Sequence, residues 1–94
     1  MRQVNYRLAE NVLFQKVSEE TVILEPETGE YYTLNAIGTF MIEQFQQDHS
    51  KTEVISLVLE NYQADEAEVS QDIDTLLTQM LNKKLLVLVE AQNG

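Results

Sequence analysis

The chain has 94 residues, of which 44% are hydrophobic, and its 16 acidic and six basic residues give a formal net charge of −10. This length fits one folded domain, and the hydrophobic content argues against disorder throughout. The charge argues against binding to nucleic acid or to an anionic membrane, because both attract basic surfaces. The absence of cysteine excludes disulfides and cysteine-ligated zinc.

We expect the chain to have neither a signal peptide nor a membrane-spanning segment. Residues 1–11 lack the apolar stretch of a signal peptide and have no strong periodicity, so we expect them to form an arm or a short extended segment. The longest aliphatic run, residues 85–89, is far too short to cross a bilayer. We therefore expect a cytoplasmic protein that does not bind membranes.

Residues 12–34 are predicted to form a three-stranded antiparallel meander. Their strands are rich in β-branched and aromatic residues and are separated by short polar breaks. Pro26 and Gly29 mark a tight turn, because proline fixes φ and glycine accepts positive φ. The predicted strands are residues 12–17, 21–25 and 30–34.

Residues 36–84 are predicted to form three helices, because apolar residues recur there at helical spacing. Asn35, Ser50 and Asp65 are the expected N-caps, and Glu53 completes a capping box with Ser50. Gly38, in the first helix, is expected to allow a close approach to the preceding strand. Beyond the helices we expect a short strand at residues 85–89 and a frayed tail at residues 91–94. The predicted architecture is one α+β domain, βββααα, over residues 1–94.

No pattern in the sequence predicts catalysis or a metal site. His49 is the only histidine and lies at a predicted helix–helix connection, where a surface loop position is expected. Acidic residues between positions 66 and 74 fall off the apolar stripe, which is typical of a solvated helix face. With three glycines in the chain there is no phosphate-binding loop. We expect a protein that is not an enzyme and has no cofactor or metal.

The third predicted strand, residues 30–34, is an edge of the meander. It has neither proline nor lysine to block pairing, so a peptide could add to it as a further strand. Tyr31 and Tyr32 must point to opposite faces of the sheet, with Tyr32 on the face of Leu34. Residues 1–11 or 85–89 could instead cover this edge, and the sequence leaves both alternatives open.

Residues 22–38 resemble the signature of the PqqD-like family. The signature is a hydrophobic strand, an acidic turn and the motif Thr-Gly-x-Tyr-Tyr-x-Leu-Asn-x-x-Gly, which here spans residues 28–38. The resemblance extends over about residues 10–88. Family members often carry glycine before the closing leucine, where this chain has Lys84.

The resemblance implies a winged-helix-like domain that recognises leader peptides of ribosomally made, post-translationally modified peptides. The leader would bind as an added strand beside the third strand and against the third helix. The implied partners are the precursor leader peptide and a maturation enzyme, either a radical SAM enzyme or a leader peptidase as in lasso-peptide pathways. The implied peptide-binding residues are Glu30, Tyr31, Tyr32, Thr33, Leu34, Asp72, Ile73, Thr75, Leu76, Gln79 and Met80.

The sequence therefore predicts a peptide chaperone, or leader-peptide recognition element, that acts as a monomer or weak dimer. Residues 42–82 hold nine acidic residues and one basic residue, Lys51, so we expect a lysine or arginine in the leader to meet this acidic half. The alternatives are a non-catalytic scaffold or dimerisation subunit that pairs through its edge strand, and a winged-helix DNA-binding protein. The net charge opposes the DNA-binding alternative.

Overall fold

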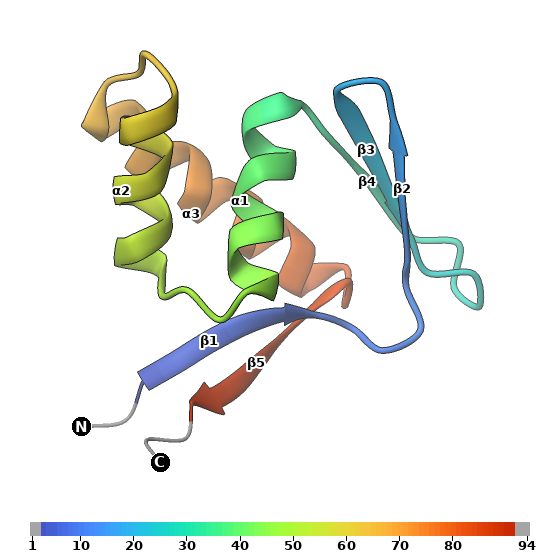
Figure 1. Cartoon of the computed structure of the whole chain (residues 1–94). Coiled ribbons are helices and arrows are strands. Elements are labelled where there is room, and N and C mark those ends of the chain that lie inside the picture. The colour runs from blue at the N-terminus through green and yellow to red at the C-terminus, as the bar shows by residue number, and fades with distance from the viewer. Residues whose placement is uncertain (1–2, 92–94) are drawn as a thin grey trace.

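The computed structural model describes residues 3–91, and Figure 1 shows how their helices and strands are arranged. A three-stranded sheet lies beside the helices, and a two-stranded ribbon lies below them. The predicted order of a meander followed by three helices is confirmed. In chain order the elements are β1 (Gln3–Leu8), β2 (Leu13–Val17), β3 (Glu20–Leu24), β4 (Tyr31–Leu34), α1 (Ala36–Gln46), α2 (Lys51–Asn61), α3 (Glu66–Asn82) and β5 (Leu86–Ala91).

The meander is the antiparallel sheet β2–β3–β4. At its β3–β4 turn Gly29 has a φ of 78°, a conformation that favours glycine. The Glu25 carboxylate stabilises the same turn by accepting the backbone N–H groups of Glu27 and Thr28. The turn that the sequence places at Pro26 and Gly29 therefore forms as expected.

The N-terminal segment expected as an arm is strand β1, which pairs antiparallel with β5 from Gln3 opposite Ala91 to Leu8 opposite Leu86. The Tyr6 ring packs edge-on against Phe45, with 5.3 Å between the ring centroids. Local pattern could not predict this strand, because its partner lies at the other end of the chain. The strand predicted at residues 85–89 is β5, which continues to Ala91 because it pairs with β1 as far as Gln3. The prediction that Ala91 begins a frayed tail is therefore wrong, and residues 92–94 of that tail lie outside the described residues.

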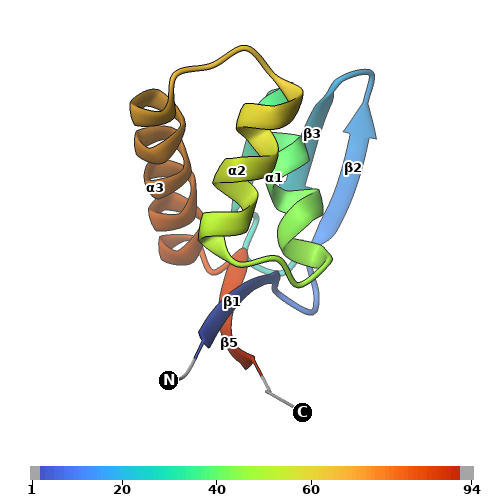
Figure 2. The same cartoon turned by 60° about the vertical axis from the view of Figure 1, so that its left-hand side comes forward.

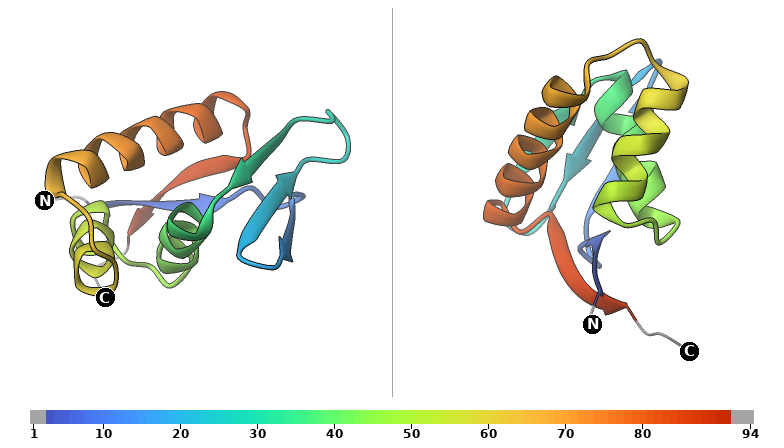
Figure 3. Two further views of the ribbon diagram at one scale, coloured as in Figure 1. Left: turned by 90° about the horizontal axis from the view of Figure 1, so that it is seen from above. Right: turned by 90° about the vertical axis from the view of Figure 1, so that its left-hand side faces the viewer.

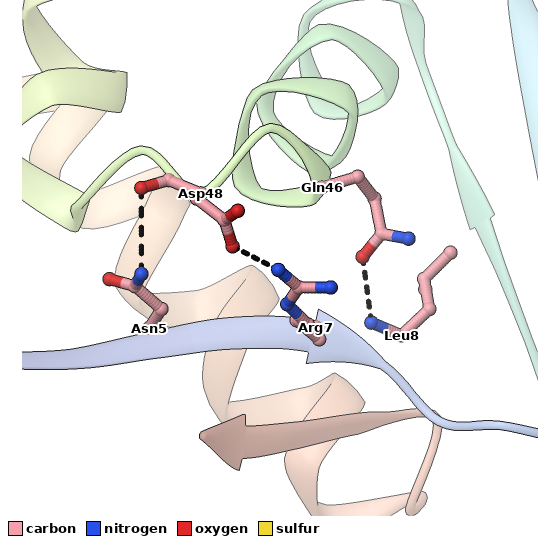
Figure 4. Close-up of polar contacts among 5 residues, drawn as sticks. All are labelled: Asn5, Arg7, Leu8, Gln46 and Asp48. Carbon is pink, nitrogen blue, oxygen red and sulfur yellow. Dashed lines mark hydrogen bonds and ion pairs between the residues drawn. The ribbon is translucent and has the colours of Figure 1, made fainter. Parts of the chain in front are cut away.

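Polar contacts hold β1 against the connection between α1 and α2 (Figure 4). The Leu8 backbone N–H donates to Gln46 Oε1 at 2.9 Å, and Arg7 forms an ion pair with Asp48. Asn5 Nδ2 donates to the Asp48 carbonyl at 3.4 Å. The edge of β1 that does not face β5 is therefore occupied by α1 and its C-terminal turn.

The predicted N-caps of α1 and α2 form as expected. Asn35 accepts the Gly38 N–H at 2.8 Å, and Ser50 and Glu53 make the reciprocal bonds of a capping box. The Ser50 backbone N–H lowers the pKa of the Glu53 carboxyl, since it binds the ionised form. Asp65 occupies the N-cap position of α3 but makes no side-chain capping bond.

Gly38 brings α1 close to β4. A Cβ atom at this position would lie 3.3 Å from Asn35 Oδ1 and 3.3 Å from Leu34 Cδ2. This distance is tighter than most real contacts of a Cβ atom, so a larger residue would force these neighbours apart. The close approach expected from the sequence is therefore present.

One hydrophobic core joins the helices to one face of the three-stranded sheet. Helix α1 packs against β3, β4, α2 and α3, and so lies at the centre of the molecule (Figures 2 and 3). Beneath it the Thr39 hydroxyl donates to the Thr21 hydroxyl at 3.0 Å, which satisfies two buried polar groups. The largest fully buried side chains include Phe45, Ile23, Leu34, Met41, Ile42, Ile73, Met80 and Leu85. None of the helices within residues 3–91 combines the length and hydropathy needed to cross a bilayer.

Helix α3 ends in a Schellman motif with Lys84 in the left-handed conformation. The Leu85 N–H bonds to the Met80 carbonyl at 2.9 Å, and the Lys84 N–H bonds to the Leu81 carbonyl at 3.0 Å. Lys84 has a φ of 60°, which glycine adopts at lower cost. The reversal buries Leu85 and Leu86 and directs β5 toward β1.

Replacing Lys84 with glycine is expected to raise the free energy of unfolding by about 0.5–1 kcal/mol, because the positive φ would no longer strain a side chain. Urea denaturation followed by circular dichroism measures the change. The matched control is Lys83→Gly, at a φ of −84°, which removes an ion pair to Glu30 without relieving strain and should lower stability. A lower stability for Lys84→Gly would contradict the assigned conformation.

Two neighbouring residues of α3 test which helix face is buried. Met80 is fully buried, so Met80→Ala should lower the free energy of unfolding by about 2–5 kcal/mol. Gln79 is exposed, and Gln79→Ala should change it by about 0.5 kcal/mol or less. Thermal and chemical denaturation of both variants gives the comparison, and equal losses would mean that α3 is rotated from the orientation described.

Candidate functional site

The outer edge of β4 is open along the described chain. The sheet order is β2–β3–β4, and β4 pairs with β3 on one side only. Strands β1 and β5 pair with each other in a separate sheet, so neither covers β4. The sequence left open whether residues 1–11 or 85–89 cover this edge, and in the described part of the chain neither segment covers it.

The register of the β3–β4 ladder identifies the groups that this edge presents. The Glu25 N–H donates to the Glu30 carbonyl at 2.8 Å, so these residues form a hydrogen-bonded pair. Hydrogen-bonded and non-hydrogen-bonded pairs alternate along an antiparallel ladder. The backbone groups of Tyr32 and Leu34 therefore face β3, whereas those of Tyr31 and Thr33 face outward.

Helix α3 runs beside this edge in the opposite direction. At one end the Lys83 ammonium bonds to Glu30 Oε2 at 3.2 Å, which links the end of α3 to the start of β4. At the other end Thr33 and Leu34 line the same hollow as Asp72 and Leu76. The helix and the open edge thus form the two walls of one groove.

Three adjoining hollows lie along α3. The hollow beside β4 has a volume of about 290 Å³ and shares Thr75 with a second hollow of about 280 Å³. The second hollow shares Gln79 with a third, of about 710 Å³, at the end of the helix. We call this series the β4–α3 groove; its main lining residues are Glu30, Tyr32, Thr33, Leu34, Asp72, Thr75, Leu76, Thr78, Gln79 and Lys83.

Most of the predicted peptide-binding residues lie along this groove. Glu30 and Gln79 line the large end hollow, whereas the others gather at the hollow beside β4. Those others are Tyr32, Thr33, Leu34, Asp72, Thr75 and Leu76.

Three predicted residues lie elsewhere. Ile73 and Met80 are fully buried in the core, so they support the groove from beneath and do not form its surface. Tyr31 is 60% exposed, and its side chain points to the face of the sheet that does not contact the helices. The helical period alone left the rotation of α3 undetermined, which is why buried and exposed positions were predicted together.

Sequence reasoning missed the part of the groove that α1 supplies. Ile37, Gly38 and Met41 line the hollow beside β4. Their helical spacing predicts that they face the core. The same spacing would be seen for residues that line a groove, so it could not distinguish the two positions. The one usable signal was Gly38, because a glycine that lets α1 approach β4 also places α1 beside whatever lies at that edge.

The hollow beside β4 carries an uncompensated negative charge from Asp72. Asp74 is paired with Lys51 of α2, whereas Asp72 makes no ion pair within residues 3–91. Glu30 is partly neutralised by Lys83 at the end hollow. A ligand side chain near Asp72 therefore meets an uncompensated carboxylate.

Residues 3–91 were expected to hold no metal site, and His49 to lie in a surface loop. No group of three or more histidine, aspartate or glutamate side chains there is arranged to hold a metal ion. His49 lies at the α1–α2 connection, as predicted, with its Nδ1 3.7 Å from Glu53 Oε1. One wall of the groove carries backbone groups of β4, and the other carries side chains of α3.

Solved structures with this fold include two complexes with leader peptides. One is described as "TbiB1 in Complex with the TbiA(beta) Leader Peptide"; it is 25% identical, with a TM-score of 0.75 over 85% of this chain and 93% of that chain. The other is described as "Lasso peptide synthetase B1 complexed with the leader peptide" and is 20% identical, with a TM-score of 0.78 over 88% and 98% of the two chains. At that lower identity the likeness shows the fold.

The family itself is shown by sequence. No curated protein matches the chain. A family model described as "Coenzyme PQQ synthesis protein D (PqqD)" matches residues 20–86, which run from β3 into β5 and include β4 and α3. Because this match spans more than half of the sequence and agrees with the fold, the chain belongs to the PqqD family.

Proposed function

We propose that this protein binds the leader segment of a ribosomally made precursor peptide and presents it to a modifying enzyme or a leader peptidase. The observation that carries the proposal is the open edge of β4 beside α3. A solved relative of the same fold, 25% identical, is a complex with a leader peptide. The chemistry belongs to the partner enzyme, and this chain supplies capture and presentation.

The leader adds to the sheet as a strand along β4. The outward N–H and C=O groups of Tyr31 and Thr33 pair with its backbone, which gives affinity without depending on sequence. Alternate leader side chains then point toward the helices and away from them. Those that point inward enter the hollow beside β4, where Leu76 and Ile37 give an apolar lining and Asp72 a charge.

The energies of this mode suit a protein that must release its peptide. About four backbone hydrogen bonds contribute on the order of 1 kcal/mol each, and two buried apolar side chains add about 2 kcal/mol each. Ordering a flexible leader costs several kcal/mol in return. The difference, about 3–6 kcal/mol, corresponds to a dissociation constant between roughly tens of micromolar and several millimolar.

Replacing Thr33 with proline tests strand addition, because it removes one outward N–H without removing a bond to β3. Calorimetric titration with leader peptides from short reading frames beside the gene should give saturable 1:1 binding to the unchanged protein. The Thr33→Pro variant should bind at least tenfold more weakly.

The matched control is Thr33→Val, which keeps the backbone N–H and the shape of the side chain and should bind as the unchanged protein does. Circular dichroism establishes that both variants are folded. Equal loss in both variants would assign binding to the Thr33 side chain and contradict strand addition. If no adjacent leader binds at all, the edge-pairing scaffold becomes the better account of the open strand.

The acidic groove predicts salt-dependent binding of leaders that carry lysine or arginine. Between 50 and 500 mM salt the affinity should fall by roughly three- to tenfold, mainly through the association rate. Asp72→Asn should flatten this dependence, whereas Glu60→Gln on α2, which does not line the groove, should leave it unchanged. Stopped-flow association rates provide the measurement, and rates that do not respond to salt would remove the electrostatic contribution.

A further inference from the structure

The sheet β2–β3–β4 has a second face, which the helices do not contact. Its residues follow from the register, because directly paired residues point to the same side. Ile23, Tyr32 and Leu34 belong to the face beneath the helices. The opposite side, which we call the outer face, carries Leu13, Gln15, Val17, Glu20, Val22, Leu24, Tyr31 and Thr33.

The outer face is unusually apolar for a surface exposed to water. Val17 is 63% exposed, Tyr31 60%, Leu13 54% and Val22 36%. An antiparallel sheet with one solvated face normally carries polar residues there. No segment within residues 3–91 covers this face, which lies on the far side of the sheet from the helices (Figures 1 and 3). A contiguous apolar face of this kind typically marks a site of association.

We propose that the outer face docks a folded protein partner whose contact surface has an apolar centre and a basic rim. This inference rests on the proposed function and assigns the partner as the enzyme that receives the peptide. Leu13, Val22 and Tyr31 provide the apolar centre. Such a centre inside a charged rim is the arrangement found in specific protein interfaces.

The charges around the outer face select a partner of this kind. Glu19 and Glu20 lie at the β2–β3 turn, and Glu27 lies at the β3–β4 turn, at the opposite end of the sheet. Glu27 also lines the end hollow of the groove, whose lining includes the cations Lys83 and Lys84. None of these carboxylates forms an ion pair within the described chain, and no charged residue lies between the two ends of the outer face. Basic residues at both ends of a partner surface would pair with them.

A second copy of this chain fits the outer face poorly. Carboxylates without an ion pair in the described chain lie at both ends of the face, Glu19 and Glu20 at one and Glu27 at the other, so stacking two copies face to face brings several of them close together. The formal charge of −10 on each chain adds a repulsion that acts over a longer range. The charges therefore favour a different protein as the occupant.

The outer face also adjoins the peptide edge. Tyr31 and Thr33 place their side chains on the outer face and their free backbone groups at the edge of β4. A partner seated on this face can reach past β4 to the added strand without entering the hollow beside β4. Capture of the peptide and docking of the enzyme can then occur at the same time.

The test measures two affinities for the same set of variants. Leu13→Thr combined with Val22→Thr removes apolar surface at two exposed positions and keeps good strand-forming residues. The matched control is Val87→Thr combined with Leu88→Thr, which makes equivalent changes at exposed positions of β5. Leader affinity is measured by calorimetry, and affinity for the purified modifying enzyme or peptidase encoded beside the gene is measured by surface plasmon resonance.

We expect the Leu13/Val22 variant to bind the enzyme at least tenfold more weakly and the leader with unchanged affinity, while the Val87/Leu88 variant matches the unchanged protein in both. Three results would overturn the inference. The Leu13/Val22 variant could still bind the enzyme, the β5 control could lose enzyme binding, or the unchanged protein could fail to bind the enzyme at all. A dimer of the unchanged protein in sedimentation equilibrium, lost in the Leu13/Val22 variant, would assign the face to a second copy and also overturn it. If the unchanged protein does not bind the leader, that result would instead contradict the proposed function.

Discussion

The pairing of β1 with β5 is the constraint on which the rest of the site depends. These are the segments that could otherwise have covered the edge of β4, and each satisfies its backbone hydrogen bonds in the other. The Schellman turn at Lys84 makes this possible, because it buries Leu85 and Leu86 and directs β5 beneath the helices. The free edge of β4 therefore results from the pairing of β1 with β5, as well as from the position of β4 at the end of the meander.

Features with local causes were predictable from the sequence, and features set by distant contacts were not. The turn at Gly29, the cap at Asn35 and the capping box at Ser50 each depend on residues within a few positions of one another, and all of them form. Strand β1 was missed because its partner is at the opposite end of the chain. Within the candidate site, the β4 residues follow from strand alternation, whereas the face of α3 depends on packing that places Met80 in the core and Gln79 at the surface.

The departure at Lys84 has a physical explanation. Glycine is expected before the closing leucine because the helix ends there in a left-handed residue, and Lys84 adopts that conformation despite its side chain. The motif persists because two backbone hydrogen bonds and the burial of Leu85 enforce it. The glycine of the family pattern and the positive φ of Lys84 thus reflect the same need for a left-handed residue at the end of α3. This chain places a lysine there, which costs some stability.

The β1–β5 ribbon also determines where a polypeptide can be attached. Gln3 lies opposite Ala91, so the two ends of the described chain leave the domain side by side, below the helices and away from β4 (Figure 1). Neighbouring ends at a surface are what domain insertion requires, because a host loop can then accept the whole unit without being pulled apart. The same arrangement suits circular permutation, in which a short linker would join the old ends and new ends would open at an exposed turn. The fold is accordingly suited to insertion into another protein, because the chain ends and the open edge of β4 lie on different sides of the molecule.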